Sequence, residues 1–179
     1  MKGFRFKRKR NSARQSLRQR FVLSFTKQGR KINRMHGFYE KLKKCLSGDL
    51  LELVSIETRN ERAKVIKDKI QKQIELQFEK TFNIPRYEQL FSKAKEGKLR
   101  MKPASALELI QKAEATAKEL VDVLLILDRE VNEMPRATPN YIIEYAKLRE
   151  LNHAYENAML LPKLHLLLLA EKLRKKYSF

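Results

Sequence analysis

The chain has 179 residues, of which 40 are Lys or Arg and 21 are Asp or Glu, so its formal net charge is +19. Its apolar content of 42% is enough, at this length, for a buried core, which excludes a disordered tail. Only five Gly and five Pro are present, which excludes collagen-like and Pro/Gly-rich classes. The single cysteine, Cys45, excludes a disulfide framework and is typical of an intracellular, reducing compartment.

The positive charge is concentrated near the N-terminus. Residues 1–46 contain 16 Lys or Arg and one acid, Glu40, so they carry +15, whereas residues 47–179 carry the remaining +4. Dense positive charge repels itself in water and is neutralised by a polyanion, whose binding releases counterions. The sequence therefore predicts two domains. Residues 1–48 form a basic arm with amphipathic helices, and residues 49–179 form a helical bundle.

The first elements follow from periodicity and turn signals. Residues 1–11 have no apolar period and carry like charges, so we expect an extended basic arm. From Ser12, apolar residues four apart predict a basic amphipathic helix that ends at Gly29. The arm and this helix together hold most of the charge.

A second amphipathic helix is predicted over residues 31–46. Cys45 lies on its apolar face, where a buried thiol is expected, and Ser47 and Gly48 act as the C-terminal stop. Residues 50–54 are too few for periodicity to distinguish a helix from a strand, and we expect a helix there.

A long helix is predicted to begin at a capping box, in which Thr58 and Glu61 satisfy each other's backbone amides. It ends before Pro85, because proline disfavours helical geometry in the preceding residue. Its apolar stripe repeats every fourth residue and is widened by three further side chains: Ile66, Ile70, Ile74, Phe78 and Phe82, with Ala63, Val65 and Leu76.

Two further helices are predicted before the last segment. Pro85 suits the first turn of a short helix that ends near Gly97, and residues 98–102 form a basic linker. A capping box at Ser105 opens a very apolar helix that runs towards Pro135 and forms the centre of the core.

The C-terminal part is predicted to contain a helix with Thr138 as N-cap and Pro139 in its first turn. Pro162 should interrupt this helix, and the Leu-rich residues 162–179 should follow as core packing. No alternating stretch is long enough for a sheet. We therefore predict an all-α fold, an antiparallel helical bundle with an extended basic N-terminal arm.

Side chains that could support catalysis are sparse. The three histidines fall in three different predicted helices without metal-ligand spacing, and no Gly-rich phosphate loop is present. The acids between Glu108 and Glu133 occupy polar helix positions and are expected on a solvated face. We therefore expect no enzyme, no metal and no cofactor.

The charge distribution favours a nucleic-acid-binding structural component, with RNA preferred to DNA, in a larger ribonucleoprotein complex with protein subunits. Phe4 and Phe6 lie among the cations, and rings beside guanidinium groups can stack on unpaired bases. The expected phosphate contacts are Arg5, Lys7, Arg8, Lys9, Arg10, Arg14, Arg18, Arg20, Arg30, Lys31 and Arg34.

Three alternatives remain open from the sequence. The chain could be a helical adaptor or scaffold subunit that docks on an acidic protein surface, with residues 58–82 and the Leu-rich tail facing the partner. It could bind a membrane surface through Leu17, Phe21 and Phe25, although no stretch is long enough to span a bilayer. The basic N-terminus also resembles a mitochondrial presequence or a nuclear address.

Overall fold

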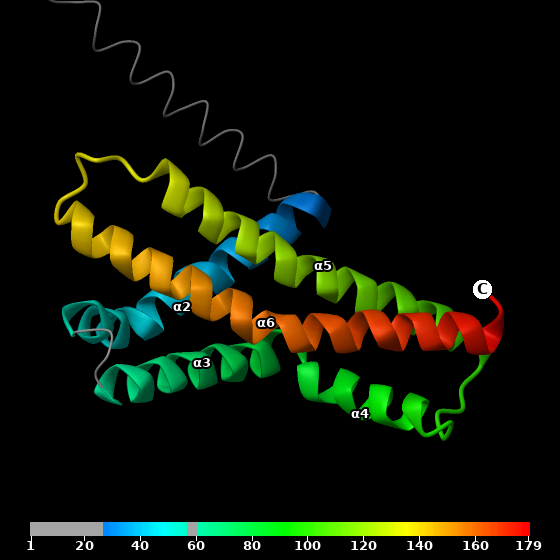
Figure 1. Ribbon diagram of the computed structural model, residues 1–179. Helices are drawn as coiled ribbons and strands as arrows, with labels where there is room; N and C mark the ends of the chain where they lie inside the picture. The colour runs from blue at the N-terminus through cyan, green and yellow to red at the C-terminus, as the bar shows by residue number, and fades with distance from the viewer. Residues whose placement is uncertain (1–26, 57–60) are drawn as a thin grey trace, which may run out of the picture. The chain divides into compact units, whose positions relative to one another are not determined.

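The computed structural model of the chain describes residues 27–56 and 61–179, which form five α-helices and no strand (Figure 1). The predicted all-α class is confirmed. The expected arm, the helix from Ser12 and the Thr58 capping box lie outside the described residues. The chain divides into two compact units, Met1–Phe38 and Tyr39–Phe179. The domain boundary predicted after residue 48 stays a prediction.

The first described helix, α2, runs without interruption over Lys27–Ser55. The predicted ends at Gly29 and at Ser47-Gly48 are therefore wrong, and the helix expected over residues 50–54 is the last part of α2. Each interior glycine costs about 1 kcal/mol, but burying one leucine contributes about 1.5–3 kcal/mol. Four leucines on one face of this helix are buried: Leu42, Leu46, Leu50 and Leu53.

Cys45 lies beside this leucine stripe and is exposed, so the expected buried thiol is wrong. The stripe advances by four residues from Leu42 to Leu46, which turns the position before Leu46 towards solvent.

Helix α3 spans Glu61–Phe82, and the five residues of its predicted stripe, together with Ala63, are buried. Val65 and Leu76 are 66% and 42% exposed, so the predicted widening of the stripe is wrong at these positions. Asn83 then adopts a left-handed conformation (φ 53°), and α4 follows over Ile84–Lys95 with Pro85 in its first turn, as predicted.

Helix α5 spans Pro103–Glu133 and ends before Pro135, as predicted. Its start differs from the prediction, because Lys102 is the N-cap residue and no side chain caps the helix. Pro103 has no N–H to satisfy and a φ suited to the first turn, so it begins the helix two residues before the expected capping box at Ser105.

Helix α6 spans Tyr141–Tyr177 and is the longest helix described, at 37 residues or about 55 Å. Asn140, with φ 55°, precedes it, so the predicted N-cap at Thr138 and the predicted place of Pro139 in the first turn are wrong. The Thr138 hydroxyl donates to the carbonyl of Pro135 at 2.6 Å. The predicted interruption at Pro162 is also wrong, since Pro162 lies inside the helix.

A proline in a helix interior removes one backbone hydrogen bond and costs about 3 kcal/mol. Helix α6 continues through Pro162 because buried residues flank it on both sides and hold both halves in place. These residues are Leu148, Leu151, Tyr155, Ala158 and Met159 before it, and Leu166, Leu169, Ala170 and Leu173 after it.

Helices α5 and α6 lie side by side and antiparallel, which confirms the predicted bundle arrangement (Figure 1). The buried Tyr155 hydroxyl donates to the carbonyl of Leu120 at 3.0 Å. At one end of the pair, leucines of α6 pack with Leu99, Ala106 and Ile110, and side chains of α4 cover this cluster.

Several acids of α5 join it to other helices, which differs from the expected solvated face. Glu130 accepts hydrogen bonds from the Tyr39 hydroxyl and from Lys43 Nζ, the latter at 3.1 Å. Asp128 accepts one from Asn152 Nδ2 at 2.6 Å, and Glu114 pairs with Arg174 at 2.6 Å. These carboxylates help to hold the bundle together.

Candidate functional site

Most of the predicted phosphate contacts lie outside the described residues. These are Arg5, Lys7, Arg8, Lys9, Arg10, Arg14, Arg18 and Arg20. The structure places the other three on α2, near its start: Arg30 and Arg34 are one turn apart, and Lys31 is three residues from Arg34. Within α2 no acid precedes Glu40, so this end of the helix carries only positive charge.

The histidines do not converge on a site. His153 and His165 both lie in α6, twelve residues apart, which corrects the expectation of three different helices. The ring of His165 stacks on Phe91 with a centroid distance of 5.0 Å, and its Nδ1 lies 3.6 Å from a carboxylate oxygen of Glu88. Within residues 27–56 and 61–179, no three His, Cys, Asp or Glu side chains are grouped so that they could hold a metal ion.

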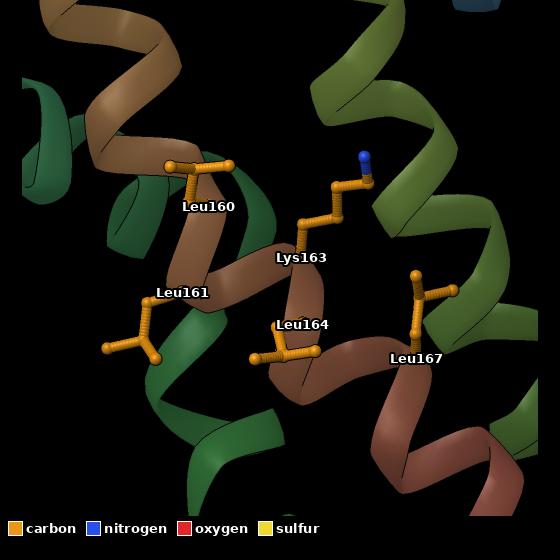
Figure 2. Close-up of a pocket in the computed structure, with 5 residues that line it drawn as sticks. All are labelled: Leu160, Leu161, Lys163, Leu164 and Leu167. Atoms are coloured by element: carbon orange, nitrogen blue, oxygen red, sulfur yellow. The ribbon is translucent and has the colours of Figure 1, made fainter.

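The outer face of α6 carries an exposed apolar surface, which we call the leucine surface. Its four leucines are between 42% and 57% exposed and, with Lys163, line a shallow hollow of about 410 Å³ (Figure 2): Leu160, Leu161, Leu164 and Leu167. Leu160, Leu164 and Leu167 are four and three residues apart, so they share one helix face.

The Leu-rich segment was expected as core packing or, in the adaptor alternative, as a partner-facing tail, and the sequence did not show which of its leucines are exposed. Leu166, Leu169 and Leu173 are indeed buried. Leu164 and Leu167 belong to the opposite side of the same helix, and this could have been read from the 3.6-residue period if α6 had been continued through Pro162.

Lys163 is the one charged residue that lines the leucine surface, and Figure 2 shows leucines on both sides of it. Its side chain is partly buried and has no ion-pair partner within the described part of the chain. A charge placed among apolar groups is stabilised when an opposite charge is brought to it. The surface therefore combines an apolar contact area with one unmatched positive charge.

In comparisons with known proteins, no family model matches this chain, and neither a curated protein nor a solved structure matches it. Its function therefore has to be argued from its own residues. Among the helices described, none combines the length and apolar character needed to cross a membrane.

Proposed function

We propose that this protein is a non-enzymatic structural component that binds nucleic acid, RNA in preference to DNA, within a larger ribonucleoprotein assembly. The observation that carries the proposal is the charge distribution: residues 1–46 hold 15 of the 19 net positive charges and contain a single acid. Cations without neighbouring acids bind phosphates in exchange for condensed counterions, and this favours a polyanion as the partner.

Local charge balance supports this division of roles. The unit Tyr39–Phe179 contains 27 Lys or Arg and 21 acids, and several of its cations pair with carboxylates, as Lys69 does with Asp49 at 2.7 Å. The unit Met1–Phe38 contains 13 Lys or Arg and no acid. The preference for RNA rests on Phe4 and Phe6, whose rings can stack on unpaired bases.

The test compares two variants of the full chain that lose the same charge. The arm variant changes Arg5, Lys7, Arg8, Lys9 and Arg10 to Gln. The matched control changes five exposed cations of the body to Gln: Lys64, Lys72, Lys80, Arg86 and Arg136. The dissociation constant for a hairpin RNA and for the DNA of the same sequence is measured by fluorescence anisotropy over a salt series.

We expect the plot of log affinity against log salt to be steep for the unchanged protein. In the arm variant its slope should fall by about 3.5–4.5, because each lost phosphate contact contributes about 0.7–0.9. The control should fall much less. An affinity that barely changes with salt, or equal losses in the two variants, would refute the proposal. RNA absorbance in protein purified without nuclease gives an independent check.

A second function is favoured by the leucine surface. We propose, as the alternative, a helical adaptor whose partner is an amphipathic helix of a protein subunit, with an apolar stripe on the leucines and a carboxylate facing Lys163. The charge complementarity of Lys163 and the helical spacing of the leucines support this occupant.

The adaptor function is tested with nuclease-treated extracts, so that contacts through nucleic acid are lost. The double variant Leu160→Asp with Leu164→Asp should no longer bind the partner. The control variant, Val65→Asp with Leu125→Asp, changes two exposed apolar residues elsewhere and should still bind it. The partner is then identified by mass spectrometry and reconstituted. Lys163→Glu should weaken the purified complex, and an acid-to-lysine change in the partner helix should restore it. Concentration-dependent self-association lost in the same Leu variants would instead identify a second copy as the occupant.

A further inference from the structure

A second cluster of positive charge lies where the loop between α4 and α5 meets the last turns of α6 (Figure 1). We call it the basic end. Residues 93–102 and 171–177 contain nine Lys or Arg and two Glu, a net of +7. The whole unit Tyr39–Phe179 carries only +6, so the rest of the body is close to neutral. The charge of the body is therefore concentrated at this end.

Backbone and side-chain hydrogen bonds hold the loop in one conformation. Gly97 has φ +72°, and the N–H groups of Lys98 and Leu99 both donate to the carbonyl of Lys93, at 2.9 and 3.1 Å. The Tyr177 hydroxyl accepts from the N–H of Met101 at 3.1 Å and donates to the same residue's carbonyl at 2.8 Å. The loop is thus fixed to the end of α6.

Side chains alternate along residues 98–102. Leu99 is 6% exposed and Met101 is partly buried, and both pack in the core cluster with α6. Lys98, Arg100 and Lys102 are exposed. The two buried residues set the register of the loop, so three cations are presented together on the solvent side, roughly 6–7 Å apart if the loop is as extended as a strand.

The acids near the basic end are already engaged. Glu96 pairs with Lys98 at 2.8 Å, Glu171 with Lys175 at 2.6 Å, and Glu114 of α5 with Arg174 at 2.6 Å. Lys176 Nζ donates to the carbonyl of Leu99 at 2.6 Å. Four exposed cations then have no carboxylate partner among the described residues: Lys93, Lys95, Arg100 and Lys102.

We propose that the basic end is a second phosphate-binding surface, which takes the sugar–phosphate backbone of the nucleic acid while the N-terminal arm binds elsewhere on it. This rests on the proposed function. Successive phosphates offer repeated charges to the cations of the loop, which alternate with the more buried Leu99 and Met101. A membrane surface is less favoured, because the apolar side chains of the loop, Leu99 and Met101, are directed into the core rather than outwards.

The test changes Lys98, Arg100 and Lys102 to Gln in the full chain and, separately, in the arm variant. The matched control changes Lys64, Lys72 and Lys80, three exposed lysines of α3. All six positions are exposed, so circular dichroism should report an intact fold. Binding to the hairpin RNA is measured by anisotropy over a salt series, and binding to phosphatidylserine vesicles by co-sedimentation.

We expect the basic-end variant to lose at least tenfold in RNA affinity at low salt, with a salt slope lower by about 2–3. The control should change less than twofold, and Lys98→Arg with Lys102→Arg should bind like the unchanged protein. A basic-end variant that binds RNA like the control would overturn the inference. Loss of vesicle binding with RNA binding retained would overturn it in favour of a lipid headgroup.

The two proposals can fail separately. If the arm variant binds RNA like the unchanged protein while the basic-end variant does not, the role of the arm is refuted and the basic end stands. If the arm variant loses binding and the basic-end variant matches its control, the reverse holds. Additive losses in the combined variant would support two separate contacts on one nucleic acid.

Discussion

The units Met1–Phe38 and Tyr39–Phe179 use the same kind of side chain in different ways. The first has 13 Lys or Arg and no acid, so its charge can be neutralised only by groups outside the segment. The second has nearly balanced charges, and cations such as Lys43 and Arg174 join helices through Glu130 and Glu114. The number of cations alone therefore does not indicate a binding surface. Cations are left to bind an external anion only where few carboxylates lie near them.

The basic end shows that this rule also holds within the body. Residues 93–102 and 171–177 have too few acids for their cations, although the unit as a whole is almost balanced. Average charge over a domain conceals such a region, because folding brings together segments that are far apart in the chain. The balance of cations and carboxylates therefore has to be compared locally.

The largest effect on stability is expected from the core of the body. Leu151 is 0% exposed on α6, and Leu151→Ala should lower the free energy of unfolding by about 2–5 kcal/mol, measured by urea denaturation. Leu160→Ala on the exposed side of the same helix should change it by less than about 0.5 kcal/mol. Similar losses at the two sites would show that the leucine surface is covered within the molecule.

The contact between α2 and α5 should give the next largest effect. Tyr39→Phe removes the hydroxyl that donates to Glu130, and a hydrogen bond to a charged group contributes about 1.5–3 kcal/mol. Thermal denaturation should show the loss. Tyr141→Phe, which removes a hydroxyl from a ring stacked on Tyr145, serves as the control and should leave the melting temperature unchanged.

Alkaline pH should weaken the body through two tyrosines. Burial raises the pKa of Tyr39, and its contact with Glu130 raises it further; burial also raises the pKa of Tyr155. Tyrosines of the unfolded chain ionise near pH 10, so this stability is complete below about pH 10 and is lost progressively above it. Asp49 raises the pKa of Lys69, which acts in the same direction.

The measurement is the free energy of unfolding from neutral to strongly alkaline pH, with tyrosinate absorbance followed in parallel. In the folded protein two of the six tyrosines should resist ionisation. The Tyr39→Phe and Tyr155→Phe double variant should show a shallower decline. A decline of unchanged steepness in that variant would assign the alkaline sensitivity to other groups.

The smallest effect is expected from the arm. Changing Lys7, Arg8, Lys9 and Arg10 to Gln should alter the free energy of unfolding by no more than about 0.5 kcal/mol, because no acid of their own segment pairs with them. Urea denaturation at low salt checks this. A loss well above that value would mean that acids of the body neutralise the arm, and the contrast between the two units would break down.

The strongest periodic pattern predicted its helix well, whereas single glycines and prolines predicted helix ends unevenly. The ends expected before Pro85 and Pro135 are confirmed. The α3 stripe from Ile66 to Phe82 repeats every four residues, and all five of its members are buried. Gly29, Gly48 and Pro162 were expected to end helices, yet α2 and α6 continue through them. At Gly48 and Pro162 the local cost of about 1–3 kcal/mol is smaller than the summed burial of the leucines on either side.

The basic end could not be found by the same means. Residues 98–102 and 172–176 are separated by about 70 positions, and each has an ordinary explanation alone, as a linker and as a helix C-terminus. The fold brings them together, through the core cluster that contains Leu99 and through the hydrogen bonds of Lys176 and Tyr177 to the loop. The exposed leucines of the Leu-rich tail could not be separated from the buried ones for a related reason, since an expected break at Pro162 hid the continuity of the helix face.

The continuity of α6 has a geometric consequence for anything that binds to it. Leu164 and Lys172 are eight residues apart on one helix, so their positions differ by about 12 Å along the axis and by a fixed rotation. The continuous helix would then fix the distance and the rotation between a protein bound to the leucines and a nucleic-acid strand bound at the basic end. Inserting one residue between Leu164 and Lys172 would rotate one bound partner around the helix axis by about 100° relative to the other. Inserting four residues would nearly restore the original relative orientation.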